Sequence, residues 1–321
     1  MKLGLVYADL LEHSLTQPLL DKKGQDTLWE TVFYEPRGTR ELNKALTFIY
    51  VMLKNEGDFS SLKHLRVERI DYCAFGNSNP FRIRIVNNYN DNYDYFYIKT
   101  ADASRVYGLE LEHLLSPNRI SYYVDEDTLI EEHIAGIPGD MFIDTLMKTK
   151  QTNRVRLAKE FVKFNERCFV RLLGDMRSYN YVLDVTPDFD DVQYRIRAID
   201  FDQQCYEGRK NLYLPQYFKE NNALVELGME VMNDKTVKQY QAEERSLIAR
   251  RLIASRYSVK ELIDCMDADS ISPPVKIAQL KEDLYKHHDN SGFLKCVNMG
   301  AILKLHLKLS LQPHIRKVRS L

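Results

Sequence analysis

One stretch of the sequence decides how the rest is interpreted: Leu172-Leu173-Gly174-Asp175-Met176-Arg177-Ser178-Tyr179-Asn180-Tyr181-Val182-Leu183-Asp184, followed by Ile199-Asp200-Phe201-Asp202. Residues 181–185 and 193–199 are rich in β-branched and aromatic side chains and flank a polar turn with proline, which predicts a β-hairpin. A hairpin places its two outer ends side by side. We therefore expect the loop that carries Asp175 and Asn180 to lie next to Asp200.

The polar side chains at these joined ends form a candidate metal site. Asp175 and Asp200 offer carboxylate oxygens, and Asn180 offers an amide oxygen. Hard divalent cations prefer such ligands, and Mg²⁺ takes few protein groups and completes its shell with water and phosphate oxygens. Each motif alone is usually a polar loop or a turn cap, so the prediction depends on the order of the motifs along the chain.

Upstream of the hairpin, the sequence predicts an antiparallel sheet. Segments rich in β-branched and aromatic residues are separated by Asn-rich turns. The expected strands cover residues 66–73, 81–86, 93–99, 120–124 and 128–133, with one helix inserted over about 103–115. The sequence Gly-Ile-Pro-Gly at 136–139 marks a change of pattern, and helices are expected at 140–150, at 152–171 and after about Pro215.

These changes in pattern divide the chain into three parts. Residues 1–65, whose one clear helix covers 42–53, are predicted to be an N-terminal accessory segment. Residues 66–135 are predicted to form a sheet lobe, and residues 136–321 a helical lobe with the hairpin embedded in it. The predicted fold class is therefore α+β.

Composition excludes several classes of protein. The 321 residues are 44% hydrophobic and 28% charged, which is typical of a globular protein rather than a disordered one. Because 45 Lys and Arg residues balance 46 Asp and Glu residues, no nucleic-acid partner is expected from bulk charge. The longest apolar segment, 45–53, is far shorter than the ~20 residues that span a bilayer, so no membrane partner is expected. The five cysteines form no C-x-x-C pair, which favours reduced thiols and a cytoplasmic location.

The loop and hairpin resemble those of the protein-kinase-like phosphotransferases, in which an Asp-x-x-x-x-Asn catalytic loop precedes an Asp-Phe-Gly-type metal site. The resemblance is nearer to the aminoglycoside phosphotransferase and choline kinase branch, whose loop reads His-Gly-Asp-x-His-x-x-Asn and whose metal motif is Ile-Asp-Phe or Ile-Asp-Trp. It implies a two-lobed protein-kinase-like fold with ATP and Mg²⁺ as cofactors. By this resemblance Asp175 would accept or position the proton of a substrate hydroxyl, and Asn180 and Asp200 would hold the metal.

The upstream half extends the resemblance. The turn between the first two predicted sheet strands is similar to the small-residue nucleotide loop of the aminoglycoside branch, in which backbone N–H groups cradle phosphate. Its candidate nucleotide-binding residues are Gly76, Ser78 and Asn79. Lys99 ends the third strand, where the family carries a lysine that pairs with nucleotide phosphates.

The same resemblance assigns residues around this lysine. The helix that follows offers Glu110 or Glu112 as the ion-pair partner of Lys99. Glu110 is favoured because it shares one helix face with Val106 and Leu114, and Glu112 is expected to be a surface residue rather than a site residue. Glu132 and His133 would lie at the hinge, whose backbone meets the adenine.

Three positions depart from the pattern of the family. Leu173 stands where the family has His, and Tyr179 replaces a residue that is usually small. Arg177 lies two residues after Asp175, where the aminoglycoside branch has His and protein kinases often have Lys. A cation there can still neutralise the transferred phosphoryl group, so Arg177 is a second candidate catalytic residue.

Three functions follow as alternatives. The first is transfer of the γ-phosphoryl group of ATP to a hydroxyl of a small molecule. The second is a pseudokinase, a binding or scaffold module without turnover, which Leu173 and the sparse nucleotide loop suggest. The third is a kinase-like enzyme that modifies a protein, by phosphorylation or by nucleotide transfer, which Arg177 suggests. The sequence predicts neither the acceptor nor the oligomeric state.

Overall fold

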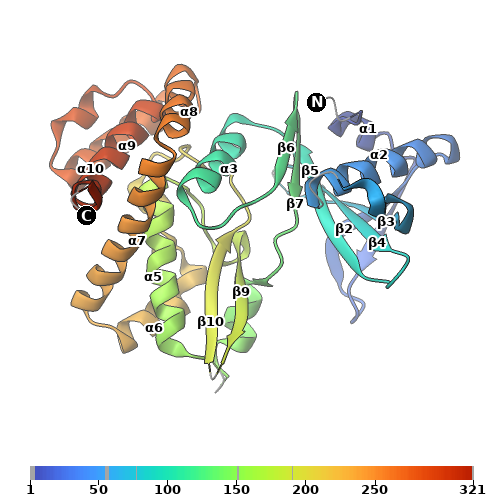
Figure 1. The fold of residues 1–321 in the computed structure, drawn as a ribbon, viewed down its shortest axis with the longest axis horizontal. Helices are drawn as coiled ribbons and strands as arrows, with labels where there is room; N and C mark the ends of the chain where they lie inside the picture. The colour runs from blue at the N-terminus through green and yellow to red at the C-terminus, as the bar shows by residue number, and fades with distance from the viewer. Residues whose placement is uncertain (1–3, 55–57, 77, 150–151, 190, 320–321) are drawn as a thin grey trace. The chain divides into compact units, whose positions relative to one another are not determined.

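The computed structural model describes residues 4–54, 58–76, 78–149, 152–189 and 191–319. It has an α+β architecture, as the sequence predicts, with an antiparallel sheet and a helical region. The chain forms two compact units (Figure 1). Residues Met1–Asp102 and Ile120–His133 make up the sheet unit, and residues Ala103–Arg119 and Ile134–Leu321 make up the helical unit.

The sheet unit contains seven antiparallel strands among the described residues, in the order β1-β2-β3-β4-β5-β7-β6. They are β1 (Leu15–Leu20), β2 (Asp26–Phe33), β3 (Leu65–Tyr72), β4 (Phe81–Asn87), β5 (Tyr93–Thr100), β6 (Tyr122–Asp125) and β7 (Thr128–Glu132). Its helical elements are α1 (Tyr7–Leu11), α2 (Pro36–Lys54) and the 3₁₀ turn η1 (Phe59–His64).

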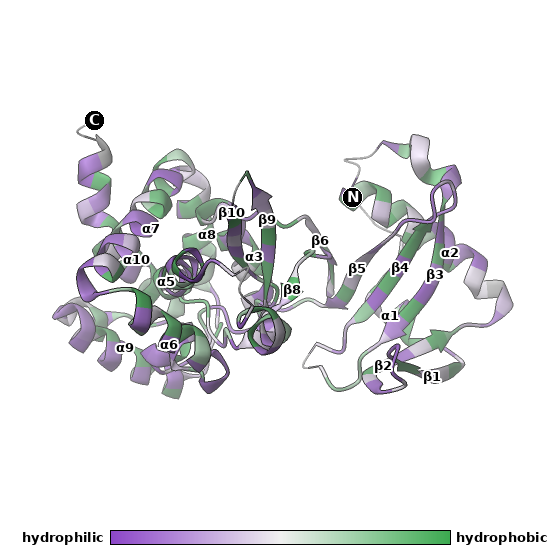
Figure 2. Ribbon diagram, turned by 90° about the horizontal axis from the view of Figure 1, so that it is seen from below, coloured by the Kyte–Doolittle hydropathy of each residue, from purple (hydrophilic) through white to green (hydrophobic). Residues whose placement is uncertain are grey.

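Alternation of side chains along β4 gives the sheet two different faces, visible as bands of hydropathy in Figure 2. Phe81, Ile83 and Ile85 are buried and belong to one core cluster with residues of α2. Each large apolar side chain buried in this way contributes about 1.5–3 kcal/mol. On the other face, the guanidinium of Arg82 lies 4.4 Å from the ring of Trp29, and that of Arg84 lies 4.0 Å from the ring of Tyr93. These cation–π contacts let a charged face lie beside aromatic rings.

The two units divide the chain differently from the three predicted parts. Residues 1–65 are not a separate segment, because β1 and β2 extend the sheet and α2 supplies part of its core. Helix α3 (Ala103–Leu115) belongs to the helical unit rather than to the sheet. Strands β1 and β2 bury only Val32, so they lack the alternation that reveals a strand, and Pro18 suits β1 to the sheet edge.

The helical unit contains a short three-stranded sheet in the order β10-β9-β8. Its strands are β8 (Ile137–Pro138), β9 (Tyr181–Asp188) and β10 (Asp191–Ala198). Besides α3, its helices are α4 (Gly139–Met141), α5 (Arg154–Arg171), α6 (Asn222–Val231), α7 (Asp234–Ala254), α8 (Arg256–Ala268), α9 (Pro274–His288) and α10 (Met299–Arg319). Its shorter turns are η2 (Phe142–Leu146), η3 (Ser178–Asn180), η4 (Lys210–Tyr213), η5 (Pro215–Tyr217), η6 (Lys219–Asn221) and η7 (Ser291–Lys295).

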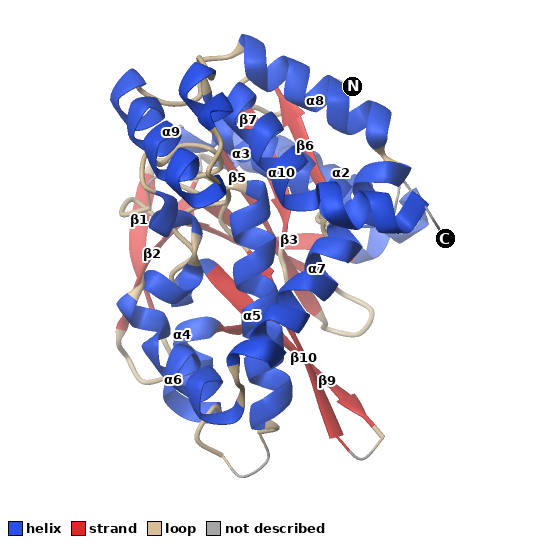
Figure 3. Cartoon of the chain, turned by 90° about the vertical axis from the view of Figure 1, so that its left-hand side faces the viewer, coloured by secondary structure: helices blue, strands red, loops and turns tan. Residues whose placement is uncertain are grey.

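Helices α5, α7, α8 and α10 pack on one another and share one apolar core (Figure 3). Among the described residues, no helix is long and apolar enough to cross a bilayer. All five cysteines are free thiols.

The helix predicted at 140–150 is instead the short α4 followed by the π-helical turn η2. The hydroxyls of Thr149 and Thr152 both donate to the carbonyl of Leu146, at 2.9 and 2.7 Å. This carbonyl is thereby satisfied by side chains, which compete with continuation of a helix.

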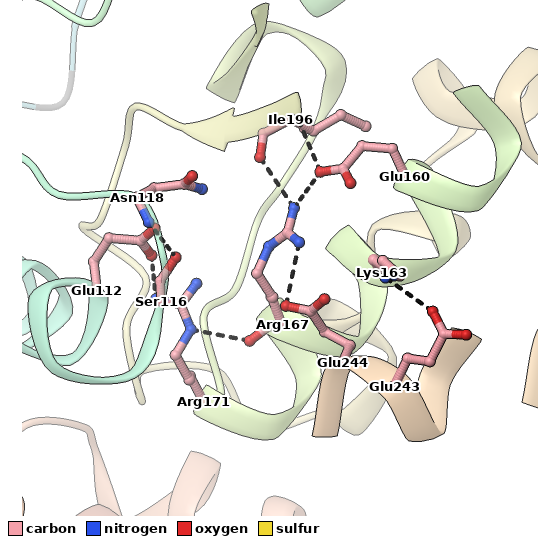
Figure 4. Close-up of polar contacts among 10 residues, drawn as sticks. All are labelled: Glu112, Ser116, Asn118, Glu160, Lys163, Arg167, Arg171, Ile196, Glu243 and Glu244. Atoms are coloured by element: carbon pink, nitrogen blue, oxygen red, sulfur yellow. Dashed lines mark hydrogen bonds and ion pairs between the residues drawn. The ribbon is translucent and has the colours of Figure 1, made fainter. Parts of the chain in front are cut away.

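Helix α5 carries two arginines in the interior of the helical unit (Figure 4). Arg167 donates to Glu160 at 2.5 Å, to Glu244 of α7 at 3.3 Å and to a backbone carbonyl of β10 at 3.2 Å. Arg171 forms an ion pair with Glu112 of α3, and both side chains are only 2% exposed. The expectation that Glu112 lies on the helix surface is therefore wrong.

The pair between Glu112 and Arg171 predicts a large effect on stability. Arg171→Ala leaves an unpaired buried carboxylate and should lower the free energy of unfolding by about 3–5 kcal/mol in urea denaturation. The double variant Glu112→Leu/Arg171→Met removes both charges and should recover most of this loss. As a control, Lys260→Ala breaks the exposed pair with Asp264 on α8 and should change stability by less than about 0.5 kcal/mol. Equal effects of Arg171→Ala and Lys260→Ala would contradict the interpretation.

Candidate functional site

The candidate site begins where α5 ends. Leu172 caps the helix in a left-handed conformation, with φ +55°, and Leu173 donates its N–H to the carbonyl of Cys168 at 2.9 Å. Leu173 is buried and forms a β-bridge with Gln204, while the N–H of Cys205 donates to the carbonyl of Leu172 at 2.8 Å. The loop is therefore tied to the segment that follows Asp200. At the position where the aminoglycoside phosphotransferase loop has His, this chain has an apolar side chain packed in the core.

Three non-glycine residues adopt a left-handed backbone conformation here: Leu172, Asp175 and Cys205, with φ of 55°, 55° and 52°. Each such residue costs about 1–2 kcal/mol, so the surrounding structure must hold it in place. The N–H of Asp175 donates to the carbonyl of Leu212 at 3.0 Å, which supplies part of that restraint. Strained backbone of this kind clusters at functional sites.

The hairpin brings Asp175, Asn180 and Asp200 to one place. Ala198 of β10 is paired with Tyr181 of β9, and the N–H of Ile199 donates to the carbonyl of Asn180 at 3.0 Å. The side-chain amide of Asn180 donates to the backbone carbonyl of Asp175 at 2.8 Å and lies 3.5 Å from its Oδ2. The nitrogen of this amide is therefore turned to Asp175, and its oxygen is left as an acceptor.

Electrostatics at Asp175 reflect this crowding. Partial burial raises the pKa of the Asp175 carboxyl above its usual value, and the neighbouring charges of Asp200 and Glu207 act in the same direction. Arg177 opposes them and lowers the pKa of Asp175. A carboxylate with a raised pKa is a stronger proton acceptor than an ordinary aspartate.

Arg177 lies between two carboxylates. Its Nε is 2.8 Å from Oδ1 of Asp175, and its Nη1 is 2.9 Å from Oε1 of Glu220 on η6. The guanidinium also lies 5.1 Å from the ring of Phe218. Glu220, which no sequence motif marks, thus helps to hold the guanidinium of Arg177 against Asp175.

Asn221, next to Glu220, supports the same loop from within the core. It is fully buried and accepts a hydrogen bond from the Tyr181 hydroxyl at 2.8 Å. Its amide nitrogen donates to the carbonyls of Met176 at 3.0 Å and Pro215 at 2.8 Å. No motif in the sequence marks Asn221, because it lies in a short turn whose partners are distant in the chain.

The residues after Asp200 are held by α3. Phe201 is 2% exposed and packs directly on Gly108, where an added Cβ would lie 2.8 Å from the Cβ of Phe201. Asp202 forms an ion pair with Arg105 at 3.7 Å. Only glycine at position 108 allows the helix to approach this closely, so α3 fixes the chain on which Asp200 sits.

The candidate metal ligands have the chemistry of an oxygen site. Asp200 supplies a carboxylate, and Asn180 supplies the amide oxygen that does not face Asp175. Across the described ranges of the chain, no group of three or more His, Cys, Asp or Glu side chains is placed to hold a metal ion by itself. A hard cation here would therefore take most of its ligands from phosphate and water, which suits Mg²⁺.

In the sheet unit, Lys99 lies near the end of β5 and forms an ion pair with Glu131 of β7. The two atoms, Nζ and Oε2, are 2.6 Å apart, and both side chains are largely buried. Glu110, the partner that the sequence predicts for Lys99, lies on α3 in the helical unit, and this pairing stays a prediction. Glu131 was missed because it faces Lys99 only once the register is known, in which Tyr97 is opposite Glu131.

The predicted nucleotide loop lies between β3 and β4, and carries Gly76, Ser78 and Asn79. Asn79 has a left-handed backbone, with φ +43°, and donates its N–H to the carbonyl of Gly76 at 3.0 Å. The N–H of Cys73 donates to the carbonyl of Pro80 at 3.0 Å, which closes the base of the loop.

Glu132 and His133, the predicted hinge residues, are engaged inside the sheet unit. The N–H of Glu132 donates to Ser121 O at 3.0 Å, and that of His133 donates to Tyr95 O at 3.3 Å. The Glu132 carboxylate lies 3.0 Å from Nζ of Lys54. Burial lowers the pKa of His133 below its usual value. The resemblance implies that backbone groups at these residues bind adenine. The N–H groups of Glu132 and His133 could do so only if they gave up their hydrogen bonds to Ser121 and Tyr95.

Asn221 provides a test of how the loop is held. Asn221→Ala leaves the buried Tyr181 hydroxyl and the Met176 carbonyl without this partner, at ~1–3 kcal/mol for each buried group left unsatisfied. We expect a matching loss of unfolding free energy in urea denaturation. The exposed neighbour Asn222 is the control, and Asn222→Ala should change stability by about 0.5 kcal/mol or less. If the two variants are equally stable, Asn221 does not support the loop.

No protein-family model matches this chain, and no curated protein matches it.

Proposed function

We propose that this chain is a protein-kinase-like phosphotransferase that moves the γ-phosphoryl group of ATP, with Mg²⁺, to a hydroxyl of a small molecule. One observation carries the proposal. The side-chain amide of Asn180 donates a hydrogen bond to the backbone carbonyl of Asp175. The backbone carbonyl of Asn180 accepts a hydrogen bond from the N–H of Ile199, the residue before Asp200. These two hydrogen bonds connect the candidate base, Asp175, with the two candidate metal ligands, Asn180 and Asp200.

Asp175 is proposed as the proton acceptor. Its Oδ1 is occupied by Arg177, so Oδ2 is the oxygen directed to a substrate hydroxyl. As the hydroxyl oxygen bonds to the γ-phosphorus, the bond to the bridging oxygen of ADP breaks, and the hydroxyl proton passes to Oδ2. Positioning of this kind, together with charge neutralisation, supplies most of the catalysis in phosphoryl transfer.

Asn180 and Asp200 would hold Mg²⁺, which would neutralise charge on the nucleotide phosphates. Lys99 in the sheet unit is proposed as the phosphate anchor, and its Nζ lies 2.6 Å from the carboxylate of Glu131. Arg177 orients Asp175 and keeps its carboxyl ionised to lower pH than burial alone would allow.

A pseudokinase is the second candidate, and the ion pair between Arg177 and Asp175 favours it. A base whose oxygen is already bound to a guanidinium is less available to a substrate. Phosphoryl transfer to any acceptor that is abolished by Asp175→Ala would eliminate this alternative. A protein acceptor is the third, supported by the cation at position 177, and a search for modified protein in treated lysate by mass spectrometry tests it.

Asp200→Asn should abolish the stabilisation of the protein by Mg²⁺ and ATP. A ligand that binds only the folded state stabilises it by about 2.7 kcal/mol at 100 times its Kd, so we expect a Mg²⁺-dependent rise in Tm for the unmodified chain. Asp264→Asn, on the exposed surface of α8, should keep the full rise. Loss of the rise in both variants, or in neither, would remove Asp200 from the metal site. The absence of any rise in the unmodified chain would contradict nucleotide binding.

Arg177→Gln should move the acid limb of the pH profile of kcat/KM to higher pH. Transfer needs ionised Asp175, and the acid limb follows the pKa of that carboxyl. Arg177 lowers this pKa against the effect of burial, so its removal raises the pKa, and activity is lost at a higher pH as the solution is acidified. Arg256→Gln, which alters an arginine of α8 that lies over Tyr257, should leave the profile unchanged. An acid limb that stays in place, or moves to lower pH, would show that Asp175 is not the titrating base.

A further inference from the structure

A tyrosine near the N-terminus is bonded to the loop between β3 and β4. The hydroxyl of Tyr7 on α1 donates to the backbone carbonyl of Asn79 at 2.7 Å. The backbone N–H of Tyr7 donates to the hydroxyl of Thr128 on β7 at 2.8 Å. Its ring lies edge-on to Phe81, the first residue of β4, with 5.5 Å between ring centres. Tyr7 thus connects the loop to β7, which lies two strands away from β4 in the sheet.

Asn79 is the residue of this loop that Tyr7 contacts. Its backbone is left-handed, with φ +43°, and its side-chain amide donates to the Tyr72 hydroxyl at 3.0 Å. Tyr72 and Phe81, which end β3 and begin β4, face each other in the ladder and have ring centres 4.8 Å apart. The loop is therefore held at its base by the strand ends and at Asn79 by Tyr7.

The donor is protonated at ordinary pH. Burial, together with the nearby Tyr72, raises the pKa of Tyr7 to about 12. Helix α1 is itself fixed, because the buried side chain of Leu10 belongs to the sheet core and its carbonyl accepts from the Tyr34 hydroxyl at 2.8 Å. The Tyr7 hydroxyl therefore keeps the proton that it donates, and α1, which carries it, is packed on the sheet core.

We propose that Tyr7 is a positioning residue for the nucleotide loop, and that α1 holds the loop in the conformation that receives phosphate. The second part rests on the proposed function. This gives residues 1–65 a role in the site, in addition to completing the sheet. The phosphate groups would meet backbone N–H groups near a residue, Asn79, that Tyr7 already holds before binding, which lowers the entropic cost of association.

The test compares Tyr7→Phe with Tyr123→Phe in the full chain. Tyr7→Phe keeps the ring on Phe81 and removes only the hydroxyl. Tyr123 is a matched control, because its hydroxyl also donates to a backbone carbonyl, that of Met52, at 3.0 Å in the same unit. We expect amide hydrogen exchange of the peptide that spans 74–80 to accelerate about three- to tenfold in Tyr7→Phe only, as the loss of one hydrogen bond predicts. KM for ATP should rise by a similar factor while kcat stays unchanged.

The outcomes separate the two claims. Unchanged exchange of 74–80 in Tyr7→Phe, or equal acceleration in Tyr123→Phe, overturns the role of Tyr7 whatever the chain does with ATP. Faster exchange with an unchanged KM overturns the link to nucleotide binding. Faster exchange in a protein whose Tm does not respond to ATP supports the contact between α1 and the loop and contradicts the proposed function.

Discussion

The stability of the helical unit depends on the partners of two buried arginines of α5, Arg167 and Arg171. Removing Arg167 and Arg171 from water costs several kcal/mol for each ion, and the loss is offset only if carboxylates and carbonyls surround them. The carboxylates come from Glu112 of α3, Glu160 of α5 and Glu244 of α7, and β10 adds a backbone carbonyl. Four elements must therefore meet at one place for the core to form without an unpaired charge.

This requirement reaches the candidate site through the end of α5. Gln204 is buried and donates its amide to the carbonyls of Arg171 at 2.5 Å and Leu172 at 3.1 Å. The same arginine that pairs with α3 thus also fixes the segment behind Asp200. Helix α3 contacts that segment again at Phe201, through Gly108. The strained backbone at Asp175 can persist because its surroundings are rigid on several sides.

Local patterns explain what the sequence could predict. The hairpin and the meeting of Asp175, Asn180 and Asp200 follow from alternation and from the geometry of antiparallel strands, which need only neighbouring residues. Strands β1 and β2 could not be recognised, because only Val32 is buried along them. Glu131 depends on strand register, and the partners of Glu220 and Asn221 depend on how distant turns pack. These are properties of the tertiary structure.

Glu112 shows a different limit. It shares the buried face of α3 with Leu115 and Gly108, so its position was visible in the helical period. Its charge argued for the surface, and only the arginine on another helix reverses that argument. A buried charge can be recognised from sequence only when its counter-charge is also placed.

The ion pair between Lys99 and Glu131 has a consequence for timing. Both residues lie in neighbouring strands of one sheet, so the pair forms when β5 and β7 join and requires no movement of a helix. The register of the two strands keeps the two side chains adjacent for as long as the ladder is intact. Folding of the sheet unit alone therefore places Lys99 beside Glu131, before any ligand is bound.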